Sequence, residues 1–571
     1  MIKILKRWVT EDRSLGKRVA LAALVSFAAC ASFLVIGLLD LYMNNVGMFP
    51  FTMGTLAGPM LVTALLCFAA MTLLLSLTRG RYFDVLLSLV LGLLLAGYMQ
   101  GNFLNISMGE LNGDAIDWGK YAVHSTVNAA VFTLIFLLPT VMCILFRSVW
   151  KKAVVILPAA ILLMETVGLI STAATTDFSA MRQPVVDREN GQFLSEKGIF
   201  DLSPNKNILV FILDRLDTKY IDMVEEDEPG FFDELDGFTY YPNHTSLYCR
   251  TYPSVVYMLT GNKSYYEKPA TQYFQDAYSS GRFIPALRKQ GFTTKLYISN
   301  YYSYNDISQL MGLADNISTE KLEVHVNHGT MMREMLRFSA YRYMPHGFKR
   351  YFWLTPEDFS ATVEIRNEEP PYDPGSYQLG EKLRKRKLTL SEEKDNFMYI
   401  HLNGCHEPFN LSANGHYVDL GTSNVVDQTK GSFKQLQRYM KQMKQLGVYE
   451  SSTIIITGDH GKSEDMFSPD TYKTTALFVK PAGSAEEPLK RSNKPLSHEN
   501  FQATVLQAAG ADTADFGKSI WEVRDDEEIV RQFLYKVNNP GGRLEEYEIR
   551  GDAQNFGNWK HIKDHPLKYD H

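Results

Sequence analysis

The chain has 571 residues, which is too long for one ordinary hydrophobic core, so we expect two or more domains. Its net charge of −6 is small for this length and gives no support to nucleic-acid binding, which requires a basic surface. The near-neutral mean hydropathy hides a split between an apolar first part, roughly 170 residues long, and a polar remainder.

Five apolar segments in the first part each approach the length that crosses a bilayer, about 20 residues. They are residues 19–39, 55–77, 83–99, 127–146 and 153–170. A single signal peptide cannot account for five such runs. We therefore expect a transmembrane domain of five helices over residues 1–172, in a multi-pass membrane protein.

The cations around these segments predict their orientation, because cytoplasmic loops carry an excess of Lys and Arg. The cations before the first segment are Lys3, Lys6, Arg7, Arg13, Lys17 and Arg18. Arg79 and Arg81 lie between the second and third segments, and Arg147, Lys151 and Lys152 between the fourth and fifth. The alternate loops hold only Lys120. The N-terminus should be cytoplasmic, and an odd number of spans places the rest of the chain outside a bacterial-type cell membrane, extracellular or periplasmic.

Glu165 lies within the fifth apolar segment, where a carboxylate is costly in lipid. It marks either a functional group or a side chain that faces another helix or the outer interface.

The second part of the chain begins with a connector and then alternates strand and helix patterns. Residues 173–206 show no clear period, as expected of a connector along the membrane surface. Short apolar runs typical of buried strands follow at "NILVFIL", "TTKLYIS", "NFMYIHL", "STIIITG" and "TTALFVK", with helical patterns at 433–446 and 500–509 among them. Such alternation predicts an α/β domain over residues 207–515 with a mainly parallel sheet flanked by helices. Residues 516–571 are predicted to form a small strand-containing appendage.

Polar groups that can bind metals follow several of these strands. Asp214 follows "NILVFIL", and Asp459 and His460 follow "STIIITG". The run "NFMYIHL" leads into "NGCHEPF", with His401 at the end of the strand and His406 beyond it. Thr251 precedes the apolar "VVYML" helix. Ligands of parallel sheets bind outside the carboxyl ends of the strands, so we expect these groups at one edge of one sheet.

Each of these residues also has an ordinary structural explanation. Asp214 alone could be a helix cap, His406 a loop histidine and Thr251 a turn residue. Together they form a coherent set, because carboxylates and imidazole suit Zn²⁺ or Mn²⁺. A threonine hydroxyl is a poor nucleophile at neutral pH, and a divalent cation activates it.

With these residues assembled, residues 207–510 resemble the alkaline phosphatase and sulfatase superfamily. Sulfatases carry Cys or Ser, any residue, Pro-Ser-Arg and then Leu-Thr-Gly, and "TYPSVVYMLTG" follows this frame with Thr251 in the nucleophile position. A threonine cannot become the formylglycine of sulfatases, and Val255 replaces their arginine. Sulfate-ester hydrolysis is therefore disfavoured.

The whole layout is most similar to lipoteichoic acid synthases and phosphoethanolamine transferases, which also have five spans, a connector and an exported domain with a metal-bound threonine. That resemblance implies one divalent ion, Mn²⁺ or Zn²⁺ with Mg²⁺ as an alternative. The implied metal ligands are Asp214, Thr251, Asp459 and His460, with Thr251 as nucleophile. Asp214 departs from the glutamate usual in those families. The resemblance also implies that His406, His498 and Lys462 contact the substrate.

The function implied is transfer of a phospho-alcohol group, such as glycerol phosphate or phosphoethanolamine, from a membrane phospholipid to an envelope glycan or glycolipid. The transfer passes through a phospho-threonine intermediate. The alternatives are a phosphodiesterase or sulfatase-like hydrolase that uses the same residues, and a catalytically dead membrane-anchored scaffold. Cys249 and Cys405 flank the motifs, and both a disulfide between them and two free thiols are compatible with the sequence.

Overall fold

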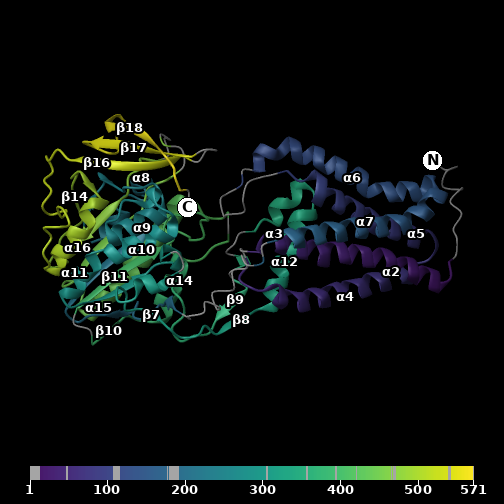
Figure 1. Ribbon diagram of the computed structural model, residues 1–571, viewed down its shortest axis with the longest axis horizontal. Coiled ribbons are helices and arrows are strands. Elements are labelled where there is room, and N and C mark those ends of the chain that lie inside the picture. Colours follow the sequence, from purple (N-terminus) through teal and green to yellow (C-terminus); the bar gives the residue numbers. More distant parts are fainter. Residues whose placement is uncertain are drawn as a thin grey trace. The chain divides into compact units, whose positions relative to one another are not determined.

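A computed structural model describes residues 13–46, 49–106, 116, 118–176, 178, 192–303, 306–354, 358–359, 361–392, 395–419, 421–463, 466, 471–537 and 542–569. The chain divides into two compact units (Figure 1). The helical unit comprises Met1–Glu189 and Leu322–Asn367, and the α/β unit comprises Asn190–Lys321 and Glu368–His571. Lys3, Lys6, Arg7 and most of the middle of the predicted connector lie outside the described residues.

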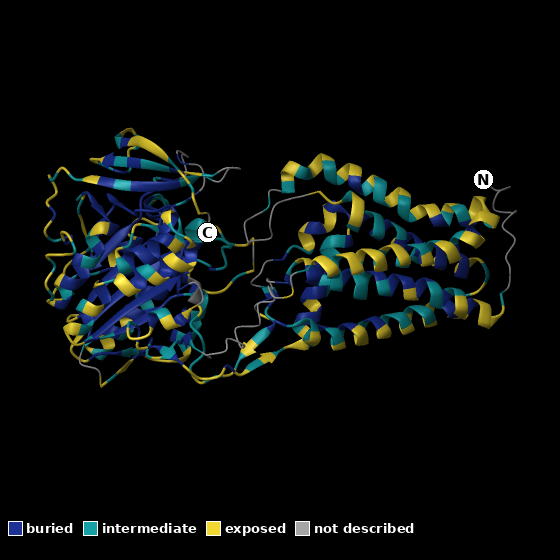
Figure 2. Cartoon of the chain, in the orientation of Figure 1, coloured by how far each residue is buried: buried dark blue, intermediate teal, exposed yellow. Residues whose placement is uncertain are grey.

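Five helical segments among the described residues are long and apolar enough to cross a membrane. They are Leu15–Asn44, Met53–Leu77, Gly80–Leu104, Trp118–Leu145 and Arg147–Thr175. Their elements are α2 (Leu15–Ala31), the π-helical turn η1 (Ser32–Ile36), α3 (Gly37–Asn44), α4 (Met53–Leu77), α5 (Gly80–Met99), the π-helical turn η3 (Gln100–Leu104), η4 (Trp118–Tyr121), α6 (Ala122–Leu145) and α7 (Arg147–Thr175). Each predicted span overlaps one segment almost completely, which confirms the prediction of five apolar helices in the first part of the chain. Many side chains on the outer faces of these helices are exposed, as lipid-facing residues would be (Figure 2).

Charged side chains within these helices have partners in the same unit. The buried Asp84 carboxylate on α5 accepts hydrogen bonds from the guanidinium groups of Arg13 and Arg147. Glu165 on α7 accepts a hydrogen bond from the Ser32 hydroxyl on η1, at 2.5 Å. Glu165 therefore faces another helix, which was one of the two explanations that the sequence left open.

One segment within the second part of the chain leaves the α/β unit and packs with the helical unit. Residues 322–367, which the sequence analysis placed in the α/β domain, group with the membrane helices. They contain β8 (Val324–Val326), α12 (His328–Tyr343), the 3₁₀ helix η11 (His346–Tyr351) and β9 (Val363–Ile365). Strands β8 and β9 pair antiparallel and close the excursion at its base. We call residues 322–367 the insert.

The α/β unit is built on a seven-stranded sheet with the order β14-β4-β13-β12-β3-β11-β6. The strands are β14 (Lys490–Arg491), β4 (Thr239–Tyr241), β13 (Leu477–Lys480), β12 (Thr453–Thr457), β3 (Lys206–Leu213), β11 (Asp395–Leu402) and β6 (Phe292–Tyr297). The central strands β12, β3, β11 and β6 are parallel, whereas β13 runs antiparallel to both its neighbours. The prediction of a mainly parallel sheet is confirmed.

Helices cover both faces of this sheet because its central strands are apolar on both sides. Along β3, Ile208, Val210 and Ile212 join one hydrophobic cluster, whereas the alternating residues Leu209 and Phe211 join the other. The first cluster includes residues of α9 (Thr251–Thr260), α10 (Ala270–Ser280), α11 (Phe283–Lys289) and α16 (Phe501–Ala509). The second includes residues of α8 (Thr218–Asp227), α14 (Ser376–Lys385) and α15 (Val425–Leu446).

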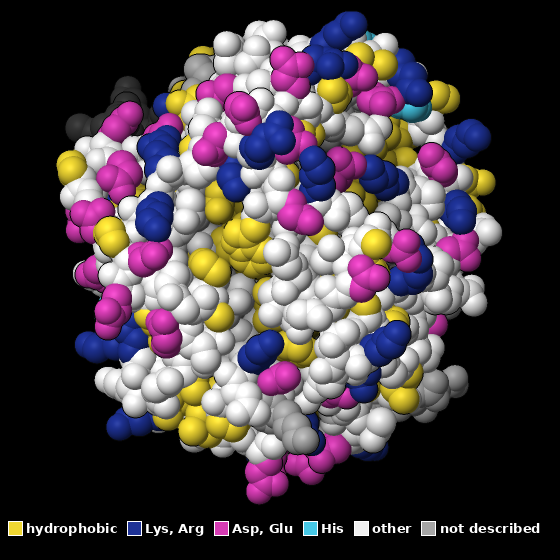
Figure 3. All heavy atoms as spheres, turned by 90° about the vertical axis from the view of Figure 1, so that its left-hand side faces the viewer, with side chains coloured by type: hydrophobic (Ala, Val, Ile, Leu, Met, Phe, Trp, Pro, Cys, Tyr) yellow, Lys and Arg dark blue, Asp and Glu magenta, His cyan; other side chains and the backbone are white. Residues whose placement is uncertain are grey.

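Shorter elements complete the α/β unit. Three strand pairs lie outside the main sheet: β1 (Phe193–Leu194) with β7 (Ile317–Ser318), β2 (Asp201–Leu202) with β10 (Thr389–Leu390), and β5 (His244–Thr245) with β15 (Leu496–Ser497). The 3₁₀ helices are η7 (Phe231–Glu234), η8 (Tyr265–Glu267), η9 (Asn300–Ser303), η10 (Ile307–Leu310), η12 (His498–Asn500) and η13 (Phe556–Asn558). The C-terminal strands β16 (Val530–Val537), β17 (Arg543–Arg550) and β18 (Trp559–Pro566) form an antiparallel sheet. Acidic and basic side chains are interspersed over the face shown in Figure 3, in keeping with the small net charge.

Candidate active site

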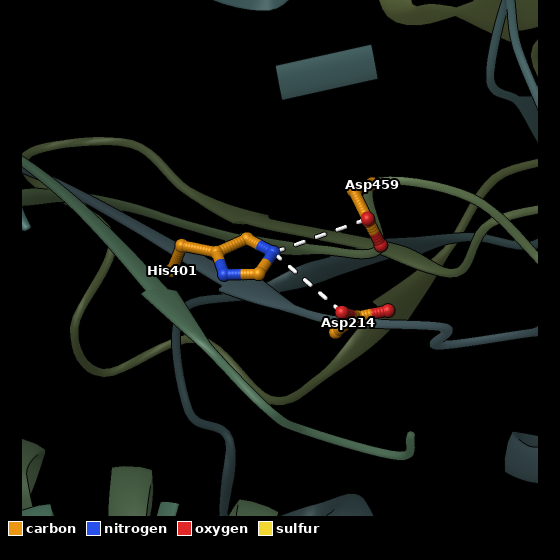
Figure 4. A group of neighbouring side chains, drawn as sticks. All are labelled: Asp214, His401 and Asp459. Carbon is orange, nitrogen blue, oxygen red and sulfur yellow. Dashed lines mark ion pairs between the residues drawn. The ribbon is translucent and has the colours of Figure 1, made fainter. Parts of the chain in front are cut away.

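Three metal-competent side chains meet at the carboxyl ends of three adjacent parallel strands. Asp214 directly follows β3, His401 is the penultimate residue of β11, and Asp459 lies just beyond β12. Their side chains point toward one another (Figure 4). The Nε2 atom of His401 lies 3.9 Å from Asp214 Oδ2 and 3.9 Å from Asp459 Oδ2. The three residues form a group that could hold a metal ion.

Thr251 and His460 complete this group from two other parts of the chain. Thr251 is the first residue of α9, and its hydroxyl oxygen lies 3.2 Å from His460 Nε2. That nitrogen is 3.7 Å from Asp214 Oδ1 and 3.6 Å from Asp459 Oδ2. The Nδ1 atom of His460 lies 2.6 Å from the Gly461 carbonyl, which can only accept a hydrogen bond. The imidazole proton is therefore on Nδ1, and the Nε2 lone pair faces Thr251 and the two carboxylates.

The donor atoms of this group fit a divalent cation. Asp214, Asp459 and His401 are buried, and Asp214 Oδ1, Asp459 Oδ2 and His401 Nε2 have no hydrogen-bond partner among the described residues. Unpartnered buried polar atoms are costly, and two carboxylates this close repel each other. A bound cation would satisfy these atoms and offset the charge, so the residues present suit Zn²⁺ or Mn²⁺.

The protonation states of the group follow from burial and from neighbouring charges. Burial and then the charge of Asp459 raise the pKa of Asp214 well above its usual value. Burial also acts to raise the pKa of Asp459, but His460, His401 and the backbone N–H of Arg215 together bring it below its usual value. Burial lowers the pKa of His460 to about 4, so its imidazole is neutral at pH 7 and able to bind a metal.

The residues predicted to contact substrate occupy different surroundings. His406 is partly buried and hydrogen-bonded through Nδ1 to the Glu407 carbonyl, and it is near enough to His460 to influence its pKa. His498 is buried, and its Nε2 lies 3.1 Å from the Gly458 carbonyl, in the loop that carries Asp459. The backbone N–H of Lys462 donates to Asp217 Oδ2 at 3.0 Å. Contact of these three residues with substrate stays a prediction.

Two residues of the site were not assigned a role from the sequence. His401 was named among the metal-competent groups at the strand ends but was not given the role of a ligand, although its ring joins the carboxylate pair. Arg215 is buried beside Asp214 in a left-handed backbone conformation (φ 62°), and its backbone N–H donates to Asp459 Oδ1 at 3.0 Å. This turn thereby connects the carboxylates of two strands. An arginine directly after a strand-end aspartate was the signal available, but residue type alone does not reveal the backbone conformation.

Asp217 ties the two loops of the site together. Its carboxylate caps α8 by accepting the backbone N–H of Lys219, and it also accepts the N–H groups of Lys462 and Tyr472. The Thr471 hydroxyl donates to the same carboxylate. The loop after β3 and the loop after β12 are therefore held by one buried side chain, which fixes Asp214 relative to Asp459.

The C-terminal sheet lies directly behind the segment that carries Thr251. The backbone N–H of Leu534 donates to the Leu247 carbonyl at 2.8 Å, and the N–H of Cys249 donates to the Leu534 carbonyl at 3.3 Å. The thiol sulfur of Cys249 accepts the N–H of Lys536 at 3.2 Å. Cys249 also packs in the hydrophobic core of this sheet. Both Cys249 and Cys405 are free thiols, so the possible disulfide between them is absent from the structure.

Comparison with protein-family models matches residues 206–511 to the family described as Sulfatase. Among solved structures, the chain is similar to a lipoteichoic acid synthase from Listeria monocytogenes, with 13% identity over 64% of this chain and 88% of that chain and a TM-score of 0.35. It is similar to a phosphonate monoester hydrolase from Silicibacter pomeroyi, with 13% identity, coverage of 61% and 87%, and a TM-score of 0.34. A protein in the alkaline phosphatase superfamily from Vibrio parahaemolyticus gives 11% identity, coverage of 68% and 86%, and a TM-score of 0.35. Comparison with curated proteins gives no match.

Proposed function

We propose that this chain, which belongs to the sulfatase family, is a membrane enzyme that moves a phospho-alcohol group, such as glycerol phosphate or phosphoethanolamine, from a membrane phospholipid to an envelope glycan or glycolipid. The observation that carries the proposal is the position of Thr251. Its hydroxyl lies 3.2 Å from a neutral His460, beside two buried carboxylates at the edge of the sheet.

The identity of the nucleophile favours phosphorus over sulfur as the atom attacked. Thr251 cannot be converted to formylglycine, and Val255 stands where sulfatases carry an arginine. The chain thus keeps the family's fold while lacking two groups on which sulfate-ester hydrolysis depends. A threonine hydroxyl can form a stable phosphate ester, which is what a transfer in two steps requires.

In the first step the Thr251 oxygen forms a bond to phosphorus, and the bond from phosphorus to the diacylglycerol oxygen breaks. The threonine hydroxyl loses its proton, and the departing diacylglycerol gains one. In the second step the oxygen of an acceptor hydroxyl forms a bond to the same phosphorus, and the bond from phosphorus to the Thr251 oxygen breaks. The acceptor hydroxyl loses its proton, and the Thr251 oxygen gains one, which regenerates free Thr251. Asp214, Asp459 and His460, together with the Thr251 oxygen, would hold the cation, and His401 lies within the same group. When bound, the cation lowers the pKa of the hydroxyl and polarises the phosphoryl oxygen.

The membrane helices support a lipid donor. Anchoring the catalytic residues to the bilayer raises the effective concentration of a phospholipid substrate. Most described cations of the five spans lie at the start of α2 (Arg13, Lys17, Arg18), at the start of α5 (Arg79, Arg81) and at the start of α7 (Arg147, Lys151, Lys152), and Lys120 lies before α6. This pattern favours a cytoplasmic N-terminus, with the α/β unit outside the cell membrane.

The test is turnover of a phospholipid labelled in its headgroup, measured on the full chain reconstituted in liposomes with and without a glycolipid acceptor. We expect wild-type protein to release diacylglycerol and label the acceptor, and Thr251→Ala to lose at least about a thousandfold in rate. Transfer of label to water when acceptor is present would identify a hydrolase. Unchanged turnover by Thr251→Ala would contradict both reactions.

A further inference from the structure

The insert is an excursion from the α/β unit that is built into the membrane helices. The ring of Tyr343, at the end of α12, packs against two glycines of the membrane helices, Gly37 on α3 and Gly101 on η3. A Cβ atom at Gly101 would lie 2.5 Å from a carbon of this ring, and Gly37 is in similarly close contact with it. The Ser339 hydroxyl donates to the Phe33 carbonyl at 2.9 Å. Helix α12 is therefore seated in the bundle by close packing.

Polar contacts made by the last residues of α12 hold it in the same place. The guanidinium of Arg342 pairs with the Asp40 carboxylate on α3 at 2.5 Å, and the Thr172 hydroxyl on α7 donates to that carboxylate at 2.9 Å. The amide of Asn105, after η3, donates to the Arg342 carbonyl at 3.0 Å. The last turn of α12 is thus bonded to the first membrane-spanning segment and to the residue that follows the third, while Thr172 of the fifth segment shares the Asp40 carboxylate.

The 3₁₀ helix η11 follows α12 and is bound to the beginning of α6. The backbone N–H of His346 donates to the Asn128 side-chain oxygen at 2.8 Å, and His346 Nδ1 lies 2.8 Å from the Ser125 hydroxyl. Both partners lie in the first two turns of α6, part of a candidate membrane span. These contacts place η11 beside the N-terminal end of the fourth span, where Trp118 and Tyr121 lie.

Large apolar side chains project from this short helix. Phe348 and Tyr351 are 55% and 63% exposed. On the adjoining turns of α6, Val123 and Val127 are 80% and 58% exposed. An exposed apolar surface of this kind next to a membrane span is unfavourable in water and favourable against lipid.

An exposed pair on η11, Arg350 with Tyr351, suits a bilayer interface. The Arg350 guanidinium lies 4.8 Å from the centre of the Tyr351 ring, whereas Lys349 is buried and its ammonium donates to the Tyr341 carbonyl. Aromatic rings with a polar end, alternating with cations, are enriched where acyl chains meet phosphate groups.

We propose that residues 344–351 lie in the interfacial layer of the bilayer, with Phe348 and Tyr351 in contact with phospholipid acyl chains and Arg350 at the level of the phosphates. The leaflet is the one in which α6 begins. The chain of the α/β unit is then tied to the membrane at the insert as well as at the connector. This inference does not depend on the reaction that the enzyme catalyses.

The experiment places an environment-sensitive fluorophore at residue 348 of the full chain in nanodiscs of phosphatidylcholine and phosphatidylglycerol. Phe348→Cys would be made in a Cys67→Ser background, because the other four native cysteines are buried. Ile562→Cys, at an exposed position of β18, is the matched control. Tyr351→Cys serves as a second site on η11.

We expect the probes at positions 348 and 351 to emit at shorter wavelength than the probe at 562. Lipids that carry a doxyl spin label near the headgroup should quench them, and iodide in the buffer should not. Quenching by iodide to the same extent as at position 562 would overturn the proposal. A shielded probe that neither quencher reaches would indicate contact with protein and would overturn it as well.

Discussion

The hydroxyl oxygen of Thr251 lies 3.2 Å from Nε2 of His460, although the two residues are 209 positions apart in the chain. The contact exists because Thr251 begins α9 while His460 follows β12, whose carboxyl end lies at the edge of the sheet where α9 starts. It puts a nucleophile next to a neutral imidazole and two carboxylates.

Replacing Asp459 by Asn should remove both metal binding and activity. The variant keeps the size of the side chain but loses one of the two buried carboxylate charges that favour a divalent ion. We expect at least about a 100-fold loss of turnover, with less than stoichiometric metal in the purified protein by elemental analysis. Asp233→Asn, on a surface-exposed side chain of η7, is the control. Normal metal content in Asp459→Asn would contradict the assignment of this ligand.

Removing the metal should destabilise the folded chain. Asp214 Oδ1, Asp459 Oδ2 and His401 Nε2 would lose their partner and remain buried. A ligand present at 100 times its dissociation constant stabilises the folded state by about 2.7 kcal/mol, and chelation reverses this. The melting temperature of the wild type should fall on chelation and recover with Zn²⁺ or Mn²⁺, whereas Asp459→Asn should be insensitive. Equal shifts in the two proteins would place the metal elsewhere.

Cys249 should affect the reaction more than it affects stability. Cys249 stands two residues before Thr251, and its sulfur accepts the backbone N–H of Lys536 in the C-terminal sheet. We expect Cys249→Ala to lower kcat several-fold with little change in KM or metal content, and Cys249→Ser, which keeps an acceptor, to recover much of the loss. Leu544→Ala, buried in the same sheet, should lower the melting temperature without lowering kcat. A parallel loss of kcat and stability in all three variants would mean that the sheet has only a structural role.

The Arg342–Asp40 ion pair should be more costly to break than to replace. Arg342→Ala leaves the partly buried Asp40 carboxylate beside Glu165 without its cation. Breaking a buried pair of this kind costs about 3–5 kcal/mol, and less where water reaches it, whereas an apolar pair of similar volume is often neutral. Arg342→Met combined with Asp40→Leu should therefore melt closer to the wild type than Arg342→Ala does. The measurement is the melting temperature of each variant in detergent. If Arg342→Ala melted closer to the wild type than the double variant does, this ion pair would not hold the insert.

Lys480 should give the α/β unit a distinctive dependence of stability on pH. Burial lowers its pKa from 10.5 to about 8 in the folded state, while its ammonium donates to the Ser452 and Pro481 carbonyls. Between pH 8 and 10.5 the unfolded chain binds the proton more strongly, so folding stability rises with pH in this window. Relative to Lys480→Met, the wild type should gain melting temperature between pH 8 and pH 10. No change in the difference between the two proteins would mean that the buried amine is not perturbed.

The main sheet and the membrane helices could be predicted because their patterns are local. Residues 208–213 of β3 are all apolar, as a strand buried on both faces must be, and the structure divides them between two cores. The antiparallel direction of β13 could not be read from its sequence, because a short apolar run carries no sign of its direction. The five spans follow from length and hydropathy alone.

The candidate site was predictable to the extent that its residues follow strands. Asp214, Asp459 and His460 stand where parallel strands end, so their meeting follows from the fold. His401 stands near the end of its strand and was expected at the same edge, but the sequence could not show that its side chain points toward the carboxylates, which depends on the register of β11 against β3. The sequence did not predict that the insert belongs to the helical unit, because the pattern of a helix such as α12 does not show which unit the helix packs against.

An anomalous-diffraction measurement at the absorption edge of the metal bound to the purified protein tests whether Thr251 and the side chains at the strand ends share one ion. We expect one strong peak whose distances to Asp214, Asp459, His460 and the Thr251 oxygen are about 2.0–2.2 Å. A peak at any other place in the chain, or a Thr251 oxygen that lies outside the coordination sphere of the ion, would contradict this expectation.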